Sequence, residues 1–347
     1  MKFGIIGSGS WGSALAKILT DNHYTINWWI RSEKNLEYFR LRHHNPQYLS
    51  STVFDISRLH LSSNVEEVIG NSDCIIMVIP AAYVAATIHS LPKNIFDNKK
   101  IISAIKGMLP EQNLLLNEYL RNEFNVALVN YFTVLGPCHA EEVAAEKLSY
   151  LTFSGIDPQA TKMVASYFKG DYINTIENAD IYGVQFAAIL KNIYALGAGI
   201  AHGLEYGDNF LSVFIANSAD EMAGFLRKVG VQNLAVGTID HSAGHVREGG
   251  ATTNYAASVY LGDLLVTCYS LYSRNRTFGN MIGKGYSVKA AQLEMNMVAE
   301  GYNASRCIAH VNRTIGAEMP IADTIFSILW KHQPPAEGFR EIESTLV

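Results

Sequence analysis

Two long apolar stretches of this sequence each hold a single charged residue. Lys191 is the only formally charged residue in 181–204, and Asp263 is the only one in 249–273. An isolated ion on an apolar helix is destabilising unless it finds a partner or loses its charge. The two residues are therefore predicted to meet, with the Lys191 ammonium acting as a general acid. The alternative is that Lys191 extends to water and that Asp263 caps a helix.

A basic cluster directly follows the Asp263 stretch. Its members are Ser273, Arg274, Asn275 and Arg276. Because a guanidinium group binds two phosphate oxygens through parallel hydrogen bonds, the cluster favours a phosphorylated substrate. A basic turn that is simply solvated is the alternative interpretation.

A glycine-rich segment begins at the seventh residue. Gly7, Gly9 and Gly12 follow an apolar run typical of a strand and precede a run typical of a helix. Glycines at this spacing allow a tight turn and a close approach of the backbone, while the first N–H groups of the helix bind a pyrophosphate. This context predicts a dinucleotide site. A glycine turn without a ligand is the alternative.

The cofactor is predicted to be NADP or NAD. Arg31 lies at the end of the second apolar run, where an NAD site usually carries an acid for the ribose 2′-hydroxyl. An arginine at this position binds the 2′-phosphate of NADP. The nearby Glu33 leaves NAD as the alternative cofactor. Arg31 is alternatively a solvated surface residue.

Two kinds of element must position these groups. Short apolar runs alternate with helical stretches in the first half, which predicts a doubly wound parallel sheet of Rossmann type. Strands are expected at residues 3–6, 24–30, 74–79, 101–105 and 126–134, and a helix at 11–20. Long helices are expected at residues 181–202, 209–229, 253–272 and 288–315. We therefore predict a dinucleotide-binding domain at residues 1–182 and an all-helical substrate-binding domain at 183–347.

The composition excludes several classes of protein. A formal net charge of −5 argues against general nucleic-acid binding, because no global positive field attracts phosphates. The four cysteines have neither the spacing of a zinc site nor that of a disulfide framework, so no metal is predicted. Uninterrupted apolar runs fall far short of the roughly 20 residues of a membrane span. With no signal peptide before the first strand, we expect a cytoplasmic protein without membrane insertion.

Several motifs, in the same order, resemble those of the soluble bacterial NAD(P)-dependent glycerol-3-phosphate dehydrogenases. The resemblance runs through nearly the whole chain, and several motifs in the right order are more specific than any one alone. It is carried by residues 7–16, 29–31, 45–49, 104–107, 136–142, 190–192, 262–264, 267–268, 273–276 and 298–301.

The resemblance implies hydride transfer between NAD(P)H and dihydroxyacetone phosphate, giving sn-glycerol 3-phosphate for phospholipid synthesis. It also implies that Lys191 donates the proton to the ketone oxygen. The implied substrate-binding residues are Lys106, Gly136, Cys138, Asp263, Ser273, Arg274 and Asn275. The implied dinucleotide-binding residues are Gly7, Gly9, Ser10, Trp11, Gly12, Arg31, Lys106, Ala140, Arg274, Val298 and Glu300.

The sequence departs from the family pattern at three places, one of which is Asn209-Phe210-Leu211, where the polar residues usual after that asparagine are absent. Cys138 and His139 stand where the family has Ser or Thr and Phe, and the chain between Lys191 and Asp263 is about one loop longer, near 241–255. Two other functions stay open: a two-domain reductase of another phosphorylated or carboxylated substrate, and a non-catalytic NAD(P)-binding sensor. Assembly into a homodimer is also left open.

Overall fold

The chain forms two compact units. The computed structural model describes residues 1–231, 258–295 and 299–347. The first unit comprises Met1–Ile105 and Leu114–Ile181, and the second comprises Lys106–Asn113 and Tyr182–Val347. The chain contributes the short segment Lys106–Asn113 to the second unit before it returns to the first, so Lys106 belongs to the same unit as Lys191.

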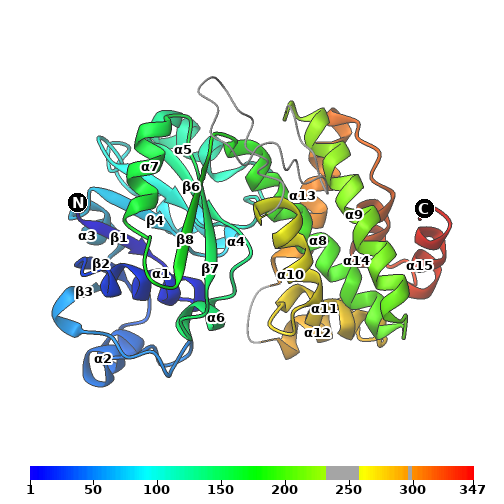
Figure 1. The fold of residues 1–347 in the computed structure, drawn as a ribbon, viewed down its shortest axis with the longest axis horizontal. Helices are drawn as coiled ribbons and strands as arrows, with labels where there is room; N and C mark the ends of the chain where they lie inside the picture. The colour runs from blue at the N-terminus through cyan, green and yellow to red at the C-terminus, as the bar shows by residue number, and fades with distance from the viewer. Residues whose placement is uncertain (232–257, 296–298) are drawn as a thin grey trace. The chain divides into compact units, whose positions relative to one another are not determined.

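The first unit is built around one eight-stranded sheet with the order β3-β2-β1-β4-β5-β6-β7-β8 (Figure 1). All neighbouring strands are parallel except β6 and β7. This is the doubly wound Rossmann arrangement, extended by two strands at one edge. The strands are β1 (Phe3–Ile6), β2 (Ile26–Trp29), β3 (Leu59–Ser62), β4 (Cys74–Met77), β5 (Lys100–Ser103), β6 (Tyr131–Leu135), β7 (Ser149–Ser154) and β8 (Ile173–Asn178).

Helices cover this sheet and explain the composition of its central strands. Every residue of β1 and β4 is buried, as expected for parallel strands that have helices on both faces. Phe3, Phe132 and Phe153 share one core with apolar residues of α1 and α7. The helices of this unit are α1 (Ser10–Asp21), α2 (Glu33–Arg42), α3 (Val65–Gly70), α4 (Ala81–Ile88), α5 (Leu116–Phe124), α6 (Ala140–Ala144) and α7 (Pro158–Ser166).

The five predicted strands and the helix expected at 11–20 are confirmed, with shifted bounds. Residues 126–134 divide into a 3₁₀ turn (Leu128–Asn130) and the start of β6. Three strands, β3, β7 and β8, were not predicted. Their Ser, Thr, Asn and His residues interrupt the apolar pattern. The edge strands β3 and β8 are partly exposed, whereas the Ser and Thr side chains of β7, which lies next to β8, are buried.

Helices make up most of the second unit, as predicted. They are α8 (Ile181–Gly203), α9 (Asp208–Lys228), α10 (Asp263–Tyr269), α11 (Arg274–Gly283), α12 (Val288–Glu294), α13 (Glu300–Ile315), α14 (Pro320–Trp330) and α15 (Pro335–Glu343) (Figure 1). A π-helical turn (Ser258–Gly262) leads directly into α10. Residues 253–257 of the helix expected at 253–272, and the longer stretch near 241–255, lie outside the described residues.

The single helix expected at 288–315 is wrong. The chain forms α12 and α13 instead, and Met295 and Ala299, which flank the interval between them, have extended backbones. The side chain of Asn275 caps the new start, because its Oδ1 accepts a hydrogen bond from the N–H of Gly301 at 2.9 Å. Apolar periodicity continues through this break, so the sequence pattern alone does not reveal it.

Helix α8 corrects the expectation that no apolar stretch reaches membrane-spanning length. It has 23 residues, and the mean hydropathy of its most apolar window is 1.3, which is long and apolar enough to span by length and composition. Gln185, Lys191 and Asn192 interrupt its apolar residues, so no uninterrupted apolar run in this helix reaches that length. All of that window is buried inside the structure, which is the environment of a core helix.

Helices α8 and α11 pack through glycines on both sides. A Cβ added to Gly279 would overlap the carbonyl oxygen of Leu196, and one added to Gly283 would overlap that of Ile200. Gly199 and Gly203 of α8 face the backbone of α11 equally closely. Paired small residues four apart let two helix backbones approach each other. The contact sets the distance between the helix that carries Lys191 and the helix that starts at Arg274.

Candidate active site

Lys191 and Asp263 form a buried ion pair. Lys191 lies in the middle of α8 and Asp263 is the first residue of α10, and their side chains are 3% and 1% exposed. Lys191 Nζ donates a hydrogen bond to Asp263 Oδ1. The predicted meeting of the two charges is therefore confirmed. The alternative is wrong, because Lys191 does not extend to water and Gly262, not Asp263, occupies the cap position of α10.

The surroundings of Lys191 tune its acidity. Burial lowers the pKa of Lys191 from its usual 10.5 to about 8, with Asp263 raising the pKa and the positive charge of Lys106 lowering it. Burial disfavours the charged ammonium, whereas the neighbouring carboxylate favours it. An amine with this pKa is protonated at neutral pH and releases a proton readily, which suits a general acid.

The second oxygen of Asp263 remains available. Thr267 Oγ1 donates to the backbone carbonyl of Asp263 at 2.5 Å and lies 3.5 Å from Oδ1. The buried Oδ2 atom has no hydrogen-bond partner among the described residues. A buried carboxylate oxygen without a donor is rare in proteins and fits a ligand or water that supplies one. Thr267 was not among the predicted site residues, although it lies one helical turn after Asp263.

A chain of side-chain amides connects four segments of this unit. Asn192 Nδ2 donates to the carbonyl oxygen of Lys106 at 3.0 Å, and Asn192 Oδ1 accepts from Asn275 Nδ2 at 2.9 Å. Asn275 Oδ1 in turn accepts from the N–H of Gly301. Both asparagines are buried. The chain therefore holds the Lys106 segment, α8, α11 and α13 in one arrangement.

Asn192 was not predicted as a site residue. Its sequence signals are that it is a second polar residue, beside Lys191, in an apolar helix, and that it lies in the 190–192 motif of the family resemblance. Asn275 was predicted to bind substrate, and the structure shows that both ends of its amide bind the protein. One amide N–H of Asn275 is left for a ligand, so its substrate contact stays a prediction.

The residues of the basic cluster have two different functions. Ser273 caps α11, because its Oγ accepts from the N–H of Arg276 at 3.3 Å. Arg276 Nη1 donates to the carbonyl oxygen of Tyr269 at 3.2 Å, so this guanidinium fastens the turn. Arg274 is the first residue of α11 and partly exposed. The first N–H groups of a helix and a guanidinium together favour an anion such as phosphate.

In the first unit, the glycine segment has the shape of a dinucleotide cradle. Gly7 has φ +130°, and a Cβ there would crowd Val78 and Ile79 after β4, whereas a Cβ on Gly12 would overlap the carbonyl oxygen of Gly7. A Cβ on Gly9 would meet nothing within 4 Å, so the open side of the turn lies there. Helix α1 starts at Ser10 after a residue with no side chain to cap it. Its start is therefore suited to a pyrophosphate.

Two residues outside the glycine segment hold it in place. The indole N–H of Trp28 donates to the carbonyl oxygen of Gly7 at 2.9 Å. Asn45 Nδ2 donates to the carbonyl oxygen of Ser8 and to Ser13 Oγ, each at 2.9 Å. Sequence reasoning assigned no function to Trp28 or Asn45. Both act through long-range contacts that no local pattern reveals.

Arg31 lies just beyond β2 and is exposed. Within the described part of the chain its side chain makes no hydrogen bond or ion pair. Ser32 caps α2 and Glu33 is its first residue, also exposed. A solvated arginine and a 2′-phosphate ligand are both consistent with this position, so the role of Arg31 stays a prediction.

The remaining predicted residues lie at element ends. Gly136 follows β6 with φ +132°, and a Cβ there would crowd the carbonyl oxygen of Tyr150. The thiol of Cys138 donates to the same carbonyl at 3.2 Å. Ala140 is the first residue of α6 and Glu300 that of α13, and their contacts to a cofactor stay a prediction. Val298 lies outside the described residues.

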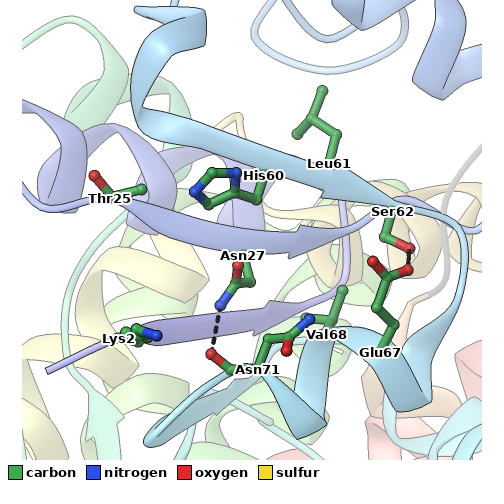
Figure 2. A pocket seen from close by; sticks show the side chains of 9 residues that line it. All are labelled: Lys2, Thr25, Asn27, His60, Leu61, Ser62, Glu67, Val68 and Asn71. Carbon is green, nitrogen blue, oxygen red and sulfur yellow. Dashed lines mark hydrogen bonds between the residues drawn. The ribbon is translucent and has the colours of Figure 1, made fainter.

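Two further observations concern other kinds of site. No group of three or more potential metal-binding side chains occurs within residues 1–231, 258–295 and 299–347. A cavity of about 410 Å³ beside α3 is lined by Asn27 of β2, His60 of β3 and Asn71, and Asn27 Nδ2 donates to the carbonyl oxygen of Asn71 at 3.0 Å (Figure 2). None of the predicted site residues lines it. It is therefore separate from the proposed dinucleotide cradle and from the ion pair.

Family models cover both halves of the chain. Residues 2–161 match the model described as "NAD-dependent glycerol-3-phosphate dehydrogenase N-terminus". Residues 180–340 match the model described as "NAD-dependent glycerol-3-phosphate dehydrogenase C-terminus". The two matches follow each other in the order of the two units.

Individual proteins agree with these models. The chain is 31% identical to a glycerol-3-phosphate dehydrogenase [NAD(P)+] of Bacillus cytotoxicus, over 95% of this chain and 91% of the relative. It is 28% identical to the enzyme of the same name from Macrococcus caseolyticus, over 99% and 97%. A crystal structure of glycerol-3-phosphate dehydrogenase from Coxiella burnetii superposes with a TM-score of 0.85, at 24% identity and with 98% of each chain covered.

Proposed function

Because the chain belongs to the NAD-dependent glycerol-3-phosphate dehydrogenase family, we propose that it interconverts dihydroxyacetone phosphate and sn-glycerol 3-phosphate with NAD(P)H. The observation that carries this proposal is the buried Lys191–Asp263 pair in the unit that also holds Arg274 at a helix start. A ketone reductase needs a proton donor, and a phosphorylated substrate needs an anion site.

The residues of the second unit act on the substrate. Lys191 donates its Nζ proton to the ketone oxygen as negative charge develops there. Asp263 keeps that amine protonated against the effect of burial. Arg274 and the start of α11 bind the phosphate, which is attached to the carbon next to the ketone carbon. Binding energy at the phosphate thereby aligns the ketone for reduction.

The residues of the first unit bind the dinucleotide. The segment with Gly7, Gly9 and Gly12 and the start of α1 hold the pyrophosphate, and Arg31 contacts the 2′-phosphate when NADP is bound. The bound nicotinamide supplies the hydride. Residues 1–182 accordingly form the dinucleotide-binding domain, and residues 183–347 the substrate-binding domain. Lys106 is the exception, because it acts with the second unit.

We place the reaction in the cytoplasm, where its product would supply phospholipid synthesis. The resemblance of the sequence to soluble bacterial enzymes supports this location. A homodimer would be recognised by light scattering as a mass of twice 38.3 kDa.

An assay of NADPH and NADH oxidation tests the proposal. We expect dihydroxyacetone phosphate to be reduced, and ketopantoate to be a poor substrate because it has no phosphate for Arg274. Arg274→Lys should raise the KM for dihydroxyacetone phosphate, since an ammonium does not reproduce the planar guanidinium. Cofactor binding without turnover would instead support a sensor, and wild-type kinetics of Arg274→Lys would remove Arg274 from the phosphate site.

A further inference from the structure

A second buried carboxylate lies in the helical unit, away from the ion pair. Glu221 of α9 is 8% exposed. Its Oε1 accepts hydrogen bonds from the hydroxyl of Tyr194 at 3.1 Å and from the N–H of Ala322 at 3.0 Å. Its Oε2 accepts from the N–H of Ile321 at 2.7 Å. One side chain therefore bridges α8, α9 and α14.

Glu221 supplies the cap that α14 lacks. The helix begins at Pro320 after Met319, whose thioether is at best a weak acceptor. The N–H groups of Ile321 and Ala322 would otherwise be buried without acceptors. A carboxylate at this end also interacts favourably with the helix dipole. The start of α14 is thus held by a residue from another helix.

The third hydrogen bond of Glu221, from Tyr194, connects it to α8, the helix that carries Lys191. Tyr194 follows Lys191 by three residues, so the two side chains leave α8 on neighbouring positions of one face. Tyr194 is fully buried, and its only hydrogen bond within the described residues goes to Glu221. A bulky ring anchored at its hydroxyl restricts rotation of α8 about its axis.

We propose that Glu221 is a positioning residue for catalysis, which through Tyr194 holds α8 in the orientation that presents Lys191 to the substrate. This inference rests on the proposed function, because it assumes that Lys191 is the proton donor. Glu221 itself touches none of the reacting groups that we assign.

The ionisation of Glu221 gives the proposal a measurable signature. Burial raises the pKa of Glu221 from 4.5 to about 7, while its hydrogen bonds from Ile321, Ala322 and Tyr194 lower the pKa and Asp323 of α14 raises it. Tyr194 and Asp323 are the titratable groups that act on it from the helices packed against α9. Since the folded pKa is above the unfolded one, ionisation makes this group less stabilising as pH rises from 4.5 to 7. Ionisation of the buried carboxylate thus costs stability near neutral pH, and the hydrogen bonds from Ile321, Ala322 and Tyr194 offset part of that cost.

The test compares turnover in wild type, Glu221→Gln, Tyr194→Phe and the double variant. We expect kcat for dihydroxyacetone phosphate to fall about tenfold or more in each single variant, because small misplacements of a reacting group cost up to about 10²-fold. The KM for NADPH should not change. The double variant should be no slower than the slower single variant, since both changes break the same connection.

The pH profile separates positioning from a general loss of stability. Wild-type kcat should fall as pH decreases through about 7, where Glu221 takes up a proton, and this acid limb should be absent in Glu221→Gln. Tyr206→Phe is the matched control, because Tyr206 donates to the exposed carboxylate of Glu343 and touches neither Lys191 nor Glu221. It should keep the wild-type profile.

The outcomes separate the inference from the proposed function. If wild type fails to reduce dihydroxyacetone phosphate, the proposed function is wrong. If wild type is active and Tyr194→Phe and Glu221→Gln keep its kcat and its acid limb, the positioning by Glu221 is wrong. Should Glu221→Gln not fold, Tyr194→Phe alone decides, because it removes only one hydroxyl group.

Discussion

At the scale of single residues, the chemistry depends on what surrounds one amine. Lys191 has the flanking residues of a core helix, and an ordinary lysine there would be neutral or unstable. Contact with Asp263 keeps it charged, while Lys106 and burial keep its pKa near 8. The opposing influences leave an acid whose strength suits neutral pH.

Removal of this amine should abolish chemistry and spare binding. In Lys191→Ala, turnover should fall by about 10²–10⁴, the usual contribution of a general acid or base. Titration of NADPH fluorescence should give an unchanged Kd, because the cradle residues lie in the other unit. Near-normal turnover in this variant would show that another group donates the proton.

Removal of the neighbouring charge should move the pH dependence. Ketone reduction by the wild type should decline as pH rises through about 8, where Lys191 loses its proton. In Asp263→Asn the decline should occur at lower pH, because the carboxylate that raises the pKa of Lys191 is gone. The measurement is kcat against pH for both proteins. An unmoved alkaline limb would contradict the electrostatic role of Asp263.

The cofactor preference should depend on Arg31. Its guanidinium is exposed and makes no ion pair within the described residues, so a 2′-phosphate faces no competitor there. Arg31→Ala should raise the KM for NADPH much more than that for NADH. Equal effects on both cofactors would assign Arg31 to the solvated surface.

At the scale of elements, close helix packing and helix starts define the site. The glycines of α8 and α11 bring the two helices together, and the amide chain through Asn192 and Asn275 adds α13 and the Lys106 segment. Neither the glycine packing nor the amide chain involves a charged group. Both hold a charged residue in the buried interior of an apolar unit, and burial shifts the pKa of such a residue.

The glycine contact should be sensitive to a single methyl group. Gly279→Ala places a Cβ on the carbonyl oxygen of Leu196, so the backbones must separate, and we expect a loss of about 1–3 kcal/mol. Gly224→Ala is the matched control, because a Cβ there meets nothing within 4 Å and alanine favours the helix. Chemical denaturation of both variants measures the difference. Equal stability would show that α8 and α11 are not in close contact.

At the scale of the whole molecule, the glycine segment of the proposed dinucleotide cradle and the proposed proton donor Lys191 belong to different units of the chain. Ligand binding to the native state raises the free energy of unfolding by about 2.7 kcal/mol at a hundredfold excess over Kd. We expect NADPH to raise the Tm of wild type and of Lys191→Ala equally in a thermal melt. A smaller increase in Lys191→Ala would mean that the amine also contributes to cofactor binding.

Much of this protein could be predicted from the sequence by itself. The glycine segment after a buried strand predicts its own turn, because only glycine adopts φ +130° without strain at Gly7. The central strands are continuous apolar runs because both of their faces are covered. Lys191 and Asp263 are conspicuous because ions are rare in apolar helices, and that rarity alone predicted their contact.

Only the tertiary structure decided how the second unit closes around those charges. Three features depend on contacts between residues distant in sequence. They are the start of α13, which Asn275 caps, the amide chain through Asn192, and the cap of α14 by Glu221. The edge strands β3 and β8 and the adjacent strand β7 were missed for a related reason, since their polar residues are tolerated by neighbours or solvent that the local pattern does not encode. Local sequence specifies backbone preference and burial, whereas a hydrogen bond between distant segments exists only after the chain has folded.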